Sequence, residues 1–153
     1  MAKRIARALI LALLAGGILA GCHASEDDPA GLAGELEDPV RREHAIANIQ
    51  RLYSQALSAS KGDRNAPEVT AVVDATVEKL SAAYLAHRED TQNGTYIMRL
   101  LADMRDPRSL PALIGALEWR SEVNEEHAVA AAETLQHIAI PADKLGAVIT
   151  ALS

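Results

Sequence analysis

Aromatic residues are scarce in this chain of 153 residues. It has no Phe, one Trp and three Tyr, whereas hydrophobic residues make up 49% of the sequence. The apolar volume therefore comes from Ala, Leu, Val and Ile, whose small or aliphatic side chains suit close packing between helices. Strands favour β-branched and aromatic residues that alternate with polar ones, and no alternating run of useful length occurs after residue 21. These two absences predict an all-α protein.

Cysteine is almost absent too, since Cys22 is the only one. A single cysteine excludes an intramolecular disulfide. Cys22 follows an apolar stretch at residues 8–19, which has three basic residues ahead of it and two glycines within it. This stretch is shorter and more broken than the ~20 apolar residues of a spanning helix, so we interpret it as a leader that is removed.

The run Leu19-Ala20-Gly21-Cys22 resembles the lipobox of bacterial lipoproteins. The resemblance implies that a signal peptidase cuts before Cys22, and that Cys22 then carries a diacylglyceryl group and an amide-linked acyl chain such as palmitate. In this family an Asp after the cysteine often signals retention in the inner membrane. His23 stands there instead, which implies the outer membrane, with a periplasmic or surface-facing orientation left open. The alternatives are an uncleaved anchor and a signal peptide with an incidental cysteine.

The charge of the chain is acidic. The formal net charge is −6 at pH 7, and removal of residues 1–21 takes away three basic residues and no acid, which leaves about −9. Nucleic acids and anionic lipid head groups attract Lys and Arg. We therefore expect no nucleic-acid partner and expect the lipid on Cys22, rather than a basic surface, to hold the protein on its membrane.

The chain divides into three expected parts: a signal peptide at 1–21, an acidic flexible tether at 22–30 and one helical repeat domain at 31–153. In the third part, apolar residues recur with the period of about six amphipathic helices. Residues that commonly begin or end helices lie at their boundaries. These boundary segments are Asp38-Pro39, Lys61-Gly62, Asn65-Ala66-Pro67, Gln92-Asn93-Gly94, Asp106-Pro107, Ser121 or Asn124, and Pro141.

Two further expectations concern packing. Leu113 should be buried between the last two helix pairs. In the final helix, which we expect to begin at Pro141, four apolar residues should turn inward against the preceding helix over 128–138: Leu145, Val148, Ile149 and Leu152. The final helix would then act as a cap, and we expect a monomer.

Three segments resemble HEAT repeats, particularly the short bacterial form that is also found in phycobilisome lyases. They are residues 38–49, 101–117 and 127–139. The resemblance implies a short α-solenoid of about three HEAT-like helix pairs that acts as a scaffold. An irregular helical bundle and a piece of a longer repeat protein are the alternatives.

No motif for catalysis or metal binding is evident. The chain has no metal-binding His-Glu-x-x-His, nucleophilic Gly-x-Ser-x-Gly or glycine-rich phosphate loop, and an acylated Cys22 would not be a nucleophile. His44, His87, His127 and His137 are expected at the surface or at helix ends rather than as ligands. Since His127 and His137 lie ~15 Å apart along one helix, they could not share a metal. We expect no enzyme, no cofactor and no metal.

Four residues are candidates for contact with a protein partner. Trp119 lies at a helix end beside an arginine, where an aromatic can anchor a partner, although it could instead cover the gap between repeats. Arg99, Glu125 and Glu126 fall on helices that should face a ligand. The sequence thus indicates a membrane-anchored, noncatalytic scaffold or adaptor that binds an envelope protein. The alternative is a helical-bundle lipoprotein that binds a small apolar ligand or assists an envelope enzyme.

Overall fold

The chain is all-helical over the part that its computed structural model describes, residues 25–119 and 125–153. No strand occurs in these residues. The helices are α2 (Pro29–Glu35), α3 (Arg42–Ala59), α4 (Pro67–Ala86), α5 (Thr91–Met104), the 3₁₀ helix η1 (Pro107–Ser109), α6 (Leu110–Glu118), α7 (Glu125–Leu135) and α8 (Leu145–Leu152). The all-α prediction is confirmed, whereas Cys22 and the leader lie outside the described residues.

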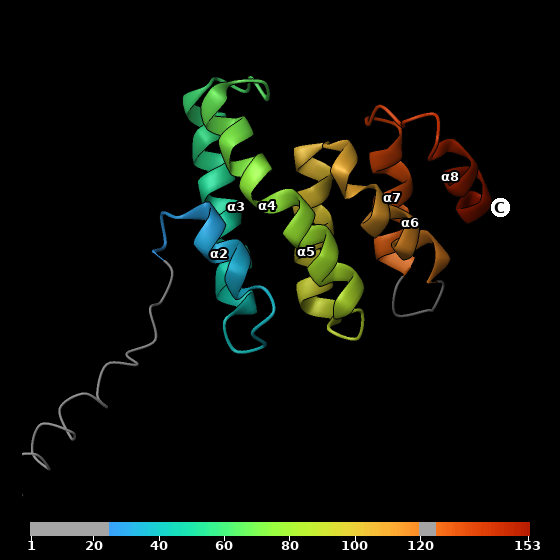
Figure 1. Cartoon of the computed structure of the whole chain (residues 1–153), viewed down its shortest axis with the longest axis horizontal. Helices are drawn as coiled ribbons and strands as arrows, with labels where there is room; N and C mark the ends of the chain where they lie inside the picture. The colour runs from blue at the N-terminus through green and yellow to red at the C-terminus, as the bar shows by residue number, and fades with distance from the viewer. Residues whose placement is uncertain (1–24, 120–124) are drawn as a thin grey trace, which may run out of the picture.

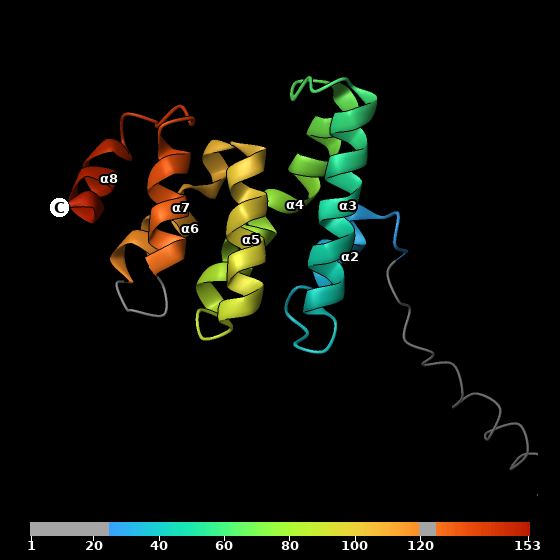
Figure 2. The same ribbon diagram turned by 180° about the vertical axis from the view of Figure 1, so that it is seen from behind.

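The helices stack in two layers (Figures 1 and 2). Helices α3, α5 and α7 lie side by side in one layer, and α2, α4 and α6 form the other. The pairs are α2 with α3, α4 with α5, and α6 with α7. Helix α8 packs on α6 at the end of the stack opposite to α2. The arrangement is solenoid-like with about three helix pairs, as expected.

Aspartate caps begin several of these helices. The Asp28 carboxylate accepts from the Ala30 N–H ahead of α2, and that of Asp90 accepts from the Asn93 N–H in the first turn of α5. Asp106 accepts from the Arg108 N–H at 2.9 Å and opens η1, which leads into α6. Such caps satisfy backbone donors that have no partner within the helix. The prediction that Asp106-Pro107 opens a helix is therefore confirmed.

Two helix starts in the first two helix pairs differ from the sequence prediction, and one helix was not predicted. Residues 38–41 form a turn in which Asp38 accepts from the Val40 N–H, so α3 begins only at Arg42. Helix α5 begins at Thr91 and includes the expected link 92–94, because Asp90 supplies the cap. The sequence also missed α2, which buries Leu32 and Ala33.

Helix α8 differs from the expected final helix in its start and in its packing. It begins at Leu145 rather than Pro141 and packs on α6 rather than on the 128–138 segment. Val148 turns inward as predicted, but three apolar side chains are about half exposed: Leu145, Ile149 and Leu152, at 48%, 58% and 52%. The reason is tertiary, since α8 meets the stack along only one side. The expectation of a monomer stays a prediction.

One continuous apolar core runs between the two layers. Leu113, Ala112 and Ala116 of α6 are fully buried in it, as the apolar stripe predicted for Leu113. Gly115 allows α6 to approach α4 closely, because a Cβ at this position would come 2.5 Å from Cδ2 of Leu85. The small residues of this sequence thus allow neighbouring helices to pack closely.

Candidate functional site

Two of the predicted partner-binding residues meet on the α5–α7 surface. Nη2 of Arg99 lies 2.7 Å from Oε1 of Glu126, and both side chains are about two-thirds exposed. Glu125 is exposed beside them in the first turn of α7, where a carboxylate complements the helix dipole. An exposed ion pair contributes only ~0–1 kcal/mol, so a partner could replace it at little cost.

A polar cavity of about 500 Å³ opens next to this pair, between α3, α5 and α7. Its lining residues are Gln50, Arg99, Ala102, Asp103, Arg105, Ala130, Glu133, Thr134 and His137. Most of these residues were not predicted from the sequence. Helical spacing could have found those on α7 and just after it, since positions 130, 133 and 137 recur at intervals of three and four residues and so would share one face of a helix.

Trp119 does not line this cavity. It follows α6 in the other layer, where its backbone N–H donates to the Gly115 carbonyl at 3.1 Å, and its side chain is half-buried. Residues 120–124, which connect it to α7, lie outside the described part. The structure therefore brings Arg99 and Glu126 together, leaves Glu125 exposed in the first turn of α7, and does not bring Trp119 into the cavity. The anchoring role of Trp119 stays a prediction.

His127 lies at a helix end, in the first turn of α7, but it is buried rather than at the surface, with 2% of its area exposed. The Thr95 hydroxyl donates to the Thr91 carbonyl and so accepts, at 2.9 Å, from Nε2–H of His127. Nδ1 then accepts from the Tyr84 hydroxyl at 3.1 Å. A neutral imidazole satisfies both of these hydrogen bonds, and burial lowers the pKa of His127 below its ordinary value.

The ring of His127 fits against Gly94. A Cβ on Gly94 would lie 2.8 Å from Cε1 of His127. The glycine that we expected in a link is therefore required inside α5, because it leaves room for the imidazole from α7. His127 joins the second helix pair to the third through packing and hydrogen bonds.

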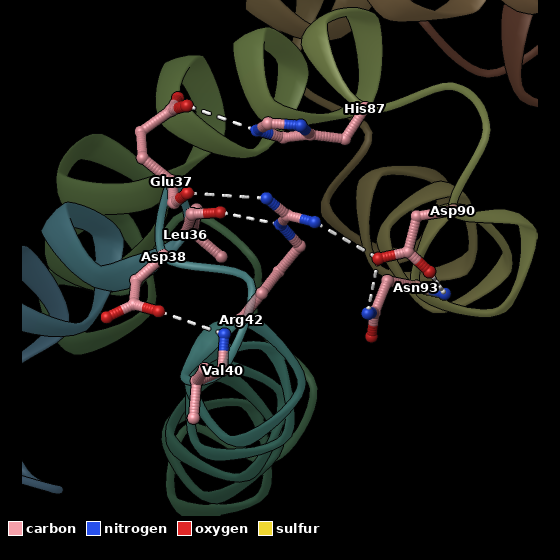
Figure 3. Close-up of polar contacts among 8 residues, drawn as sticks. All are labelled: Leu36, Glu37, Asp38, Val40, Arg42, His87, Asp90 and Asn93. Atoms are coloured by element: carbon pink, nitrogen blue, oxygen red, sulfur yellow. Dashed lines mark hydrogen bonds and ion pairs between the residues drawn. The ribbon is translucent and has the colours of Figure 1, made fainter.

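Arg42 makes the corresponding junction between the first and second pairs (Figure 3). Its side chain is buried, and Nε donates to the Leu36 carbonyl at 2.7 Å while Nη1 donates to Asp90 at 3.1 Å. Nη2 donates to the Glu37 carbonyl at 3.4 Å. One guanidinium thus links the end of α2, the start of α3 and the cap of α5. The fork of donors on Arg suits such a contact better than Lys does.

This contact also changes the acidity of Asp90. Burial alone would raise the pKa of the Asp90 carboxyl, but hydrogen bonds from Asn93 and Arg42 outweigh it and lower the pKa below its ordinary value. Beside this site, Nε2 of His87 lies 3.1 Å from Oε2 of Glu37. His87 therefore lies at the end of α4, as expected, where it is half-exposed and paired with the Glu37 carboxylate.

The described residues offer no cluster with the composition of a metal site, since no three His, Cys, Asp or Glu side chains among them converge. Within the same part of the chain, no helix has the length and apolar character to cross a membrane. Comparison of the sequence and structure with known protein families, curated proteins and solved structures finds no match. The function below therefore depends on the sequence motifs and the surface geometry.

Proposed function

We propose that the protein is a membrane-anchored, noncatalytic scaffold or adaptor that binds a protein partner in the bacterial cell envelope. The observation that carries this proposal is the polar cavity across α3, α5 and α7, which a two-layer stack of helices presents. Stacked helix pairs commonly use such extended surfaces for binding. The HEAT-like segments of the sequence support the same function.

The chemistry of this surface suits a polar segment of a protein. Ala102 and Ala130 are small and leave room, while Arg99 and Glu133 supply opposite charges within the same cavity. Arginine is enriched at protein interfaces, and a central buried contact usually carries most of the affinity. A partner with an acidic and a basic group could therefore exchange its own charges for the exposed Arg99–Glu126 pair.

The resemblance to a lipobox supports attachment at Cys22, and His23 in place of an Asp after the cysteine supports an outer-membrane location. The described chain begins close to that point, at the α2 end of the stack (Figure 1). Its first residues are held against α3, because Nη2 of Arg51 donates to the Glu26 carbonyl at 2.7 Å and to Asp27 at 3.2 Å. A lipid on Cys22 would thus lie only a few residues from the folded domain, which would keep the partner surface near the membrane.

Site-specific photo-crosslinking in envelope membranes tests this function. A photoreactive residue at Ala102, in the cavity, should capture a defined protein, whereas the same residue at Ala71, exposed on α4, should not. Replacement of Arg99, Glu125 and Glu126 together by Ala should weaken the capture without loss of helicity, and Trp119→Ala is the companion variant. Capture that persists in both variants would place the binding surface elsewhere, and turnover of an envelope substrate would contradict a noncatalytic role.

A second candidate function is the binding of a small apolar ligand. It is favoured by a larger and more apolar cavity of about 650 Å³, which lies between α4, α6 and the start of α8. This volume is typical of sites that hold one small molecule.

A further inference from the structure

The cavity beside α8 has a mainly hydrocarbon lining. Its residues are Glu78, Ser81, Ala82, Leu85, Pro107, Arg108, Leu110, Pro111, Ile114, Pro141, Lys144 and Ala147. Three of them are prolines, which have no backbone N–H to offer. An apolar groove of this size, bordered by a few charged groups, is the usual form of a small-molecule site.

Most polar groups of this lining already have partners within the protein. The Ser81 hydroxyl accepts from the Ala112 N–H at 3.2 Å. The Arg108 guanidinium donates to Asp106 at 2.8 and 2.7 Å and to Asp74 at 2.7 Å. A ligand that brings its own amides into the groove would lose hydrogen bonds to water without replacement. A hydrocarbon chain makes no such demand.

The size of the groove suits one small molecule. Its volume of about 650 Å³ lies within the usual range of ligand pockets, roughly 300–1,000 Å³. An extended peptide in the groove would set backbone N–H and C=O groups against hydrocarbon, where they would lack hydrogen-bond partners. An acyl chain has no such groups.

Lys144 lines the groove and offers a contact for an anionic head group. Its Nζ lies 3.3 Å from the carboxylate of its neighbour Asp143, and both side chains are more than half exposed. Such a pair is weak, so a ligand carboxylate could replace Asp143. Arg108, the other cation of the lining, is already bound to Asp106 and Asp74, which leaves Lys144 as the contact for the head group.

We propose that this groove binds a single fatty acid, with its chain between α4 and α6 and its carboxylate at Lys144. The proposal rests on the second candidate function and not on the partner surface. The two sites have no lining residue in common, so either can fail without the other.

The test uses the full chain in envelope membranes and palmitic acid that carries a photoreactive diazirine in its chain. After irradiation, mass spectrometry should find the label on peptides from 110–118 or 141–152. Ala82→Trp and Ala147→Trp should reduce this labelling to background, because both positions are exposed and line the groove. Val129→Trp is the matched control, since Val129 is exposed on α7, and its labelling should equal that of the natural chain.

The head group is tested separately. Lys144→Gln should lower labelling a few-fold, Lys144→Arg should retain it, and a diazirine alcohol of the same chain length should label more weakly than the acid. Equal labelling by the alcohol would overturn the Lys144 contact.

Three results would overturn the fatty-acid site. They are labelling that both groove tryptophans leave unchanged, labelling by a diazirine phospholipid but not by the fatty acid, and capture of a protein by a photoreactive residue at Ala82. Protein capture at Ala102 should continue in the groove variants, so a failure here differs from a failure of the scaffold function.

Discussion

Replacement of Arg42 by Met should destabilise the domain by roughly 3 kcal/mol. Hydrogen bonds to charged groups contribute about 1.5–3 kcal/mol each, and removal of one partner of a buried pair costs ~3–5 kcal/mol. We use the lower part of this range because Asp90 keeps 32% of its side chain exposed and the contact to the Glu37 carbonyl is long, at 3.4 Å. For a domain with a stability of about 5–15 kcal/mol this is a large share.

Urea denaturation followed by circular dichroism, on a soluble form without residues 1–22, measures the loss. Arg41→Met is the matched control, because Arg41 is half-exposed and makes only long contacts to Glu35 and Asp38, at 3.4 and 3.5 Å. It should cost less than about 1 kcal/mol. Equal stabilities for the two variants would show that the buried guanidinium is no better than a hydrocarbon of similar size, which would refute the junction at Arg42.

The same experiment has a pH arm. Because Asp90 has a lowered pKa in the folded chain, its contribution is present above its unfolded pKa, near 4, and is lost as the pH falls through the folded pKa. The stability difference between the natural chain and Arg42→Met should therefore narrow below about pH 4. A difference that stays constant down to pH 2 would mean that the Asp90 contact contributes little.

Further predictions concern the core, the buried histidine and the anchor. Leu113→Ala should cost ~2–5 kcal/mol in urea denaturation, because it leaves a cavity between fully buried neighbours; an unchanged midpoint would contradict this packing. Burial lowers the pKa of His127 in the folded chain. The contribution of the neutral imidazole to the free energy of unfolding is therefore complete above the unfolded pKa of ~6.5, and it is lost as the pH falls through the folded pKa. Thermal melts should thus show less acid destabilisation between pH 7.5 and 5.5 in His127→Phe than in the natural chain. Cys22→Ala should abolish lipidation and processing before residue 22, which mass spectrometry of the membrane-derived protein detects; an unmodified Cys22 in the natural chain would argue against a lipoprotein.

The helical content could be predicted from the sequence because helix formation depends on local signals. The apolar period of α3 to α6 and the cap at Asp106 act within a few residues, so they needed no knowledge of the fold. The same signals failed at α2, whose seven residues hold too few apolar positions to show a period. They also indicated a link at Gly94, although Asp90 caps α5 at Thr91, and the histidine from α7 that fits against Gly94 is visible only in the fold.

The candidate surface was predictable only in part. Arg99 and Glu126 were expected on one face, but their mutual ion pair depends on the distance between α5 and α7. Arg42 belongs to a segment that resembles a repeat, yet its partners come from two parts of the chain, the carbonyls at 36–37 and the carboxylate of Asp90. The polar junctions therefore could not be predicted, because their partners are separated in the sequence and only the fold brings them into contact.

Composition and local pattern by themselves determined that this protein would be helical, with Ala and aliphatic residues in its core, because these properties arise within single turns of the backbone. Only the tertiary structure decided which apolar faces are covered. It buries Leu113, leaves Leu145 and Ile149 half exposed, and encloses His127 although that residue is polar. The physical reason is that burial depends on the neighbours that a face meets in space, and for α8 and α7 those neighbours come from helices far away in the sequence.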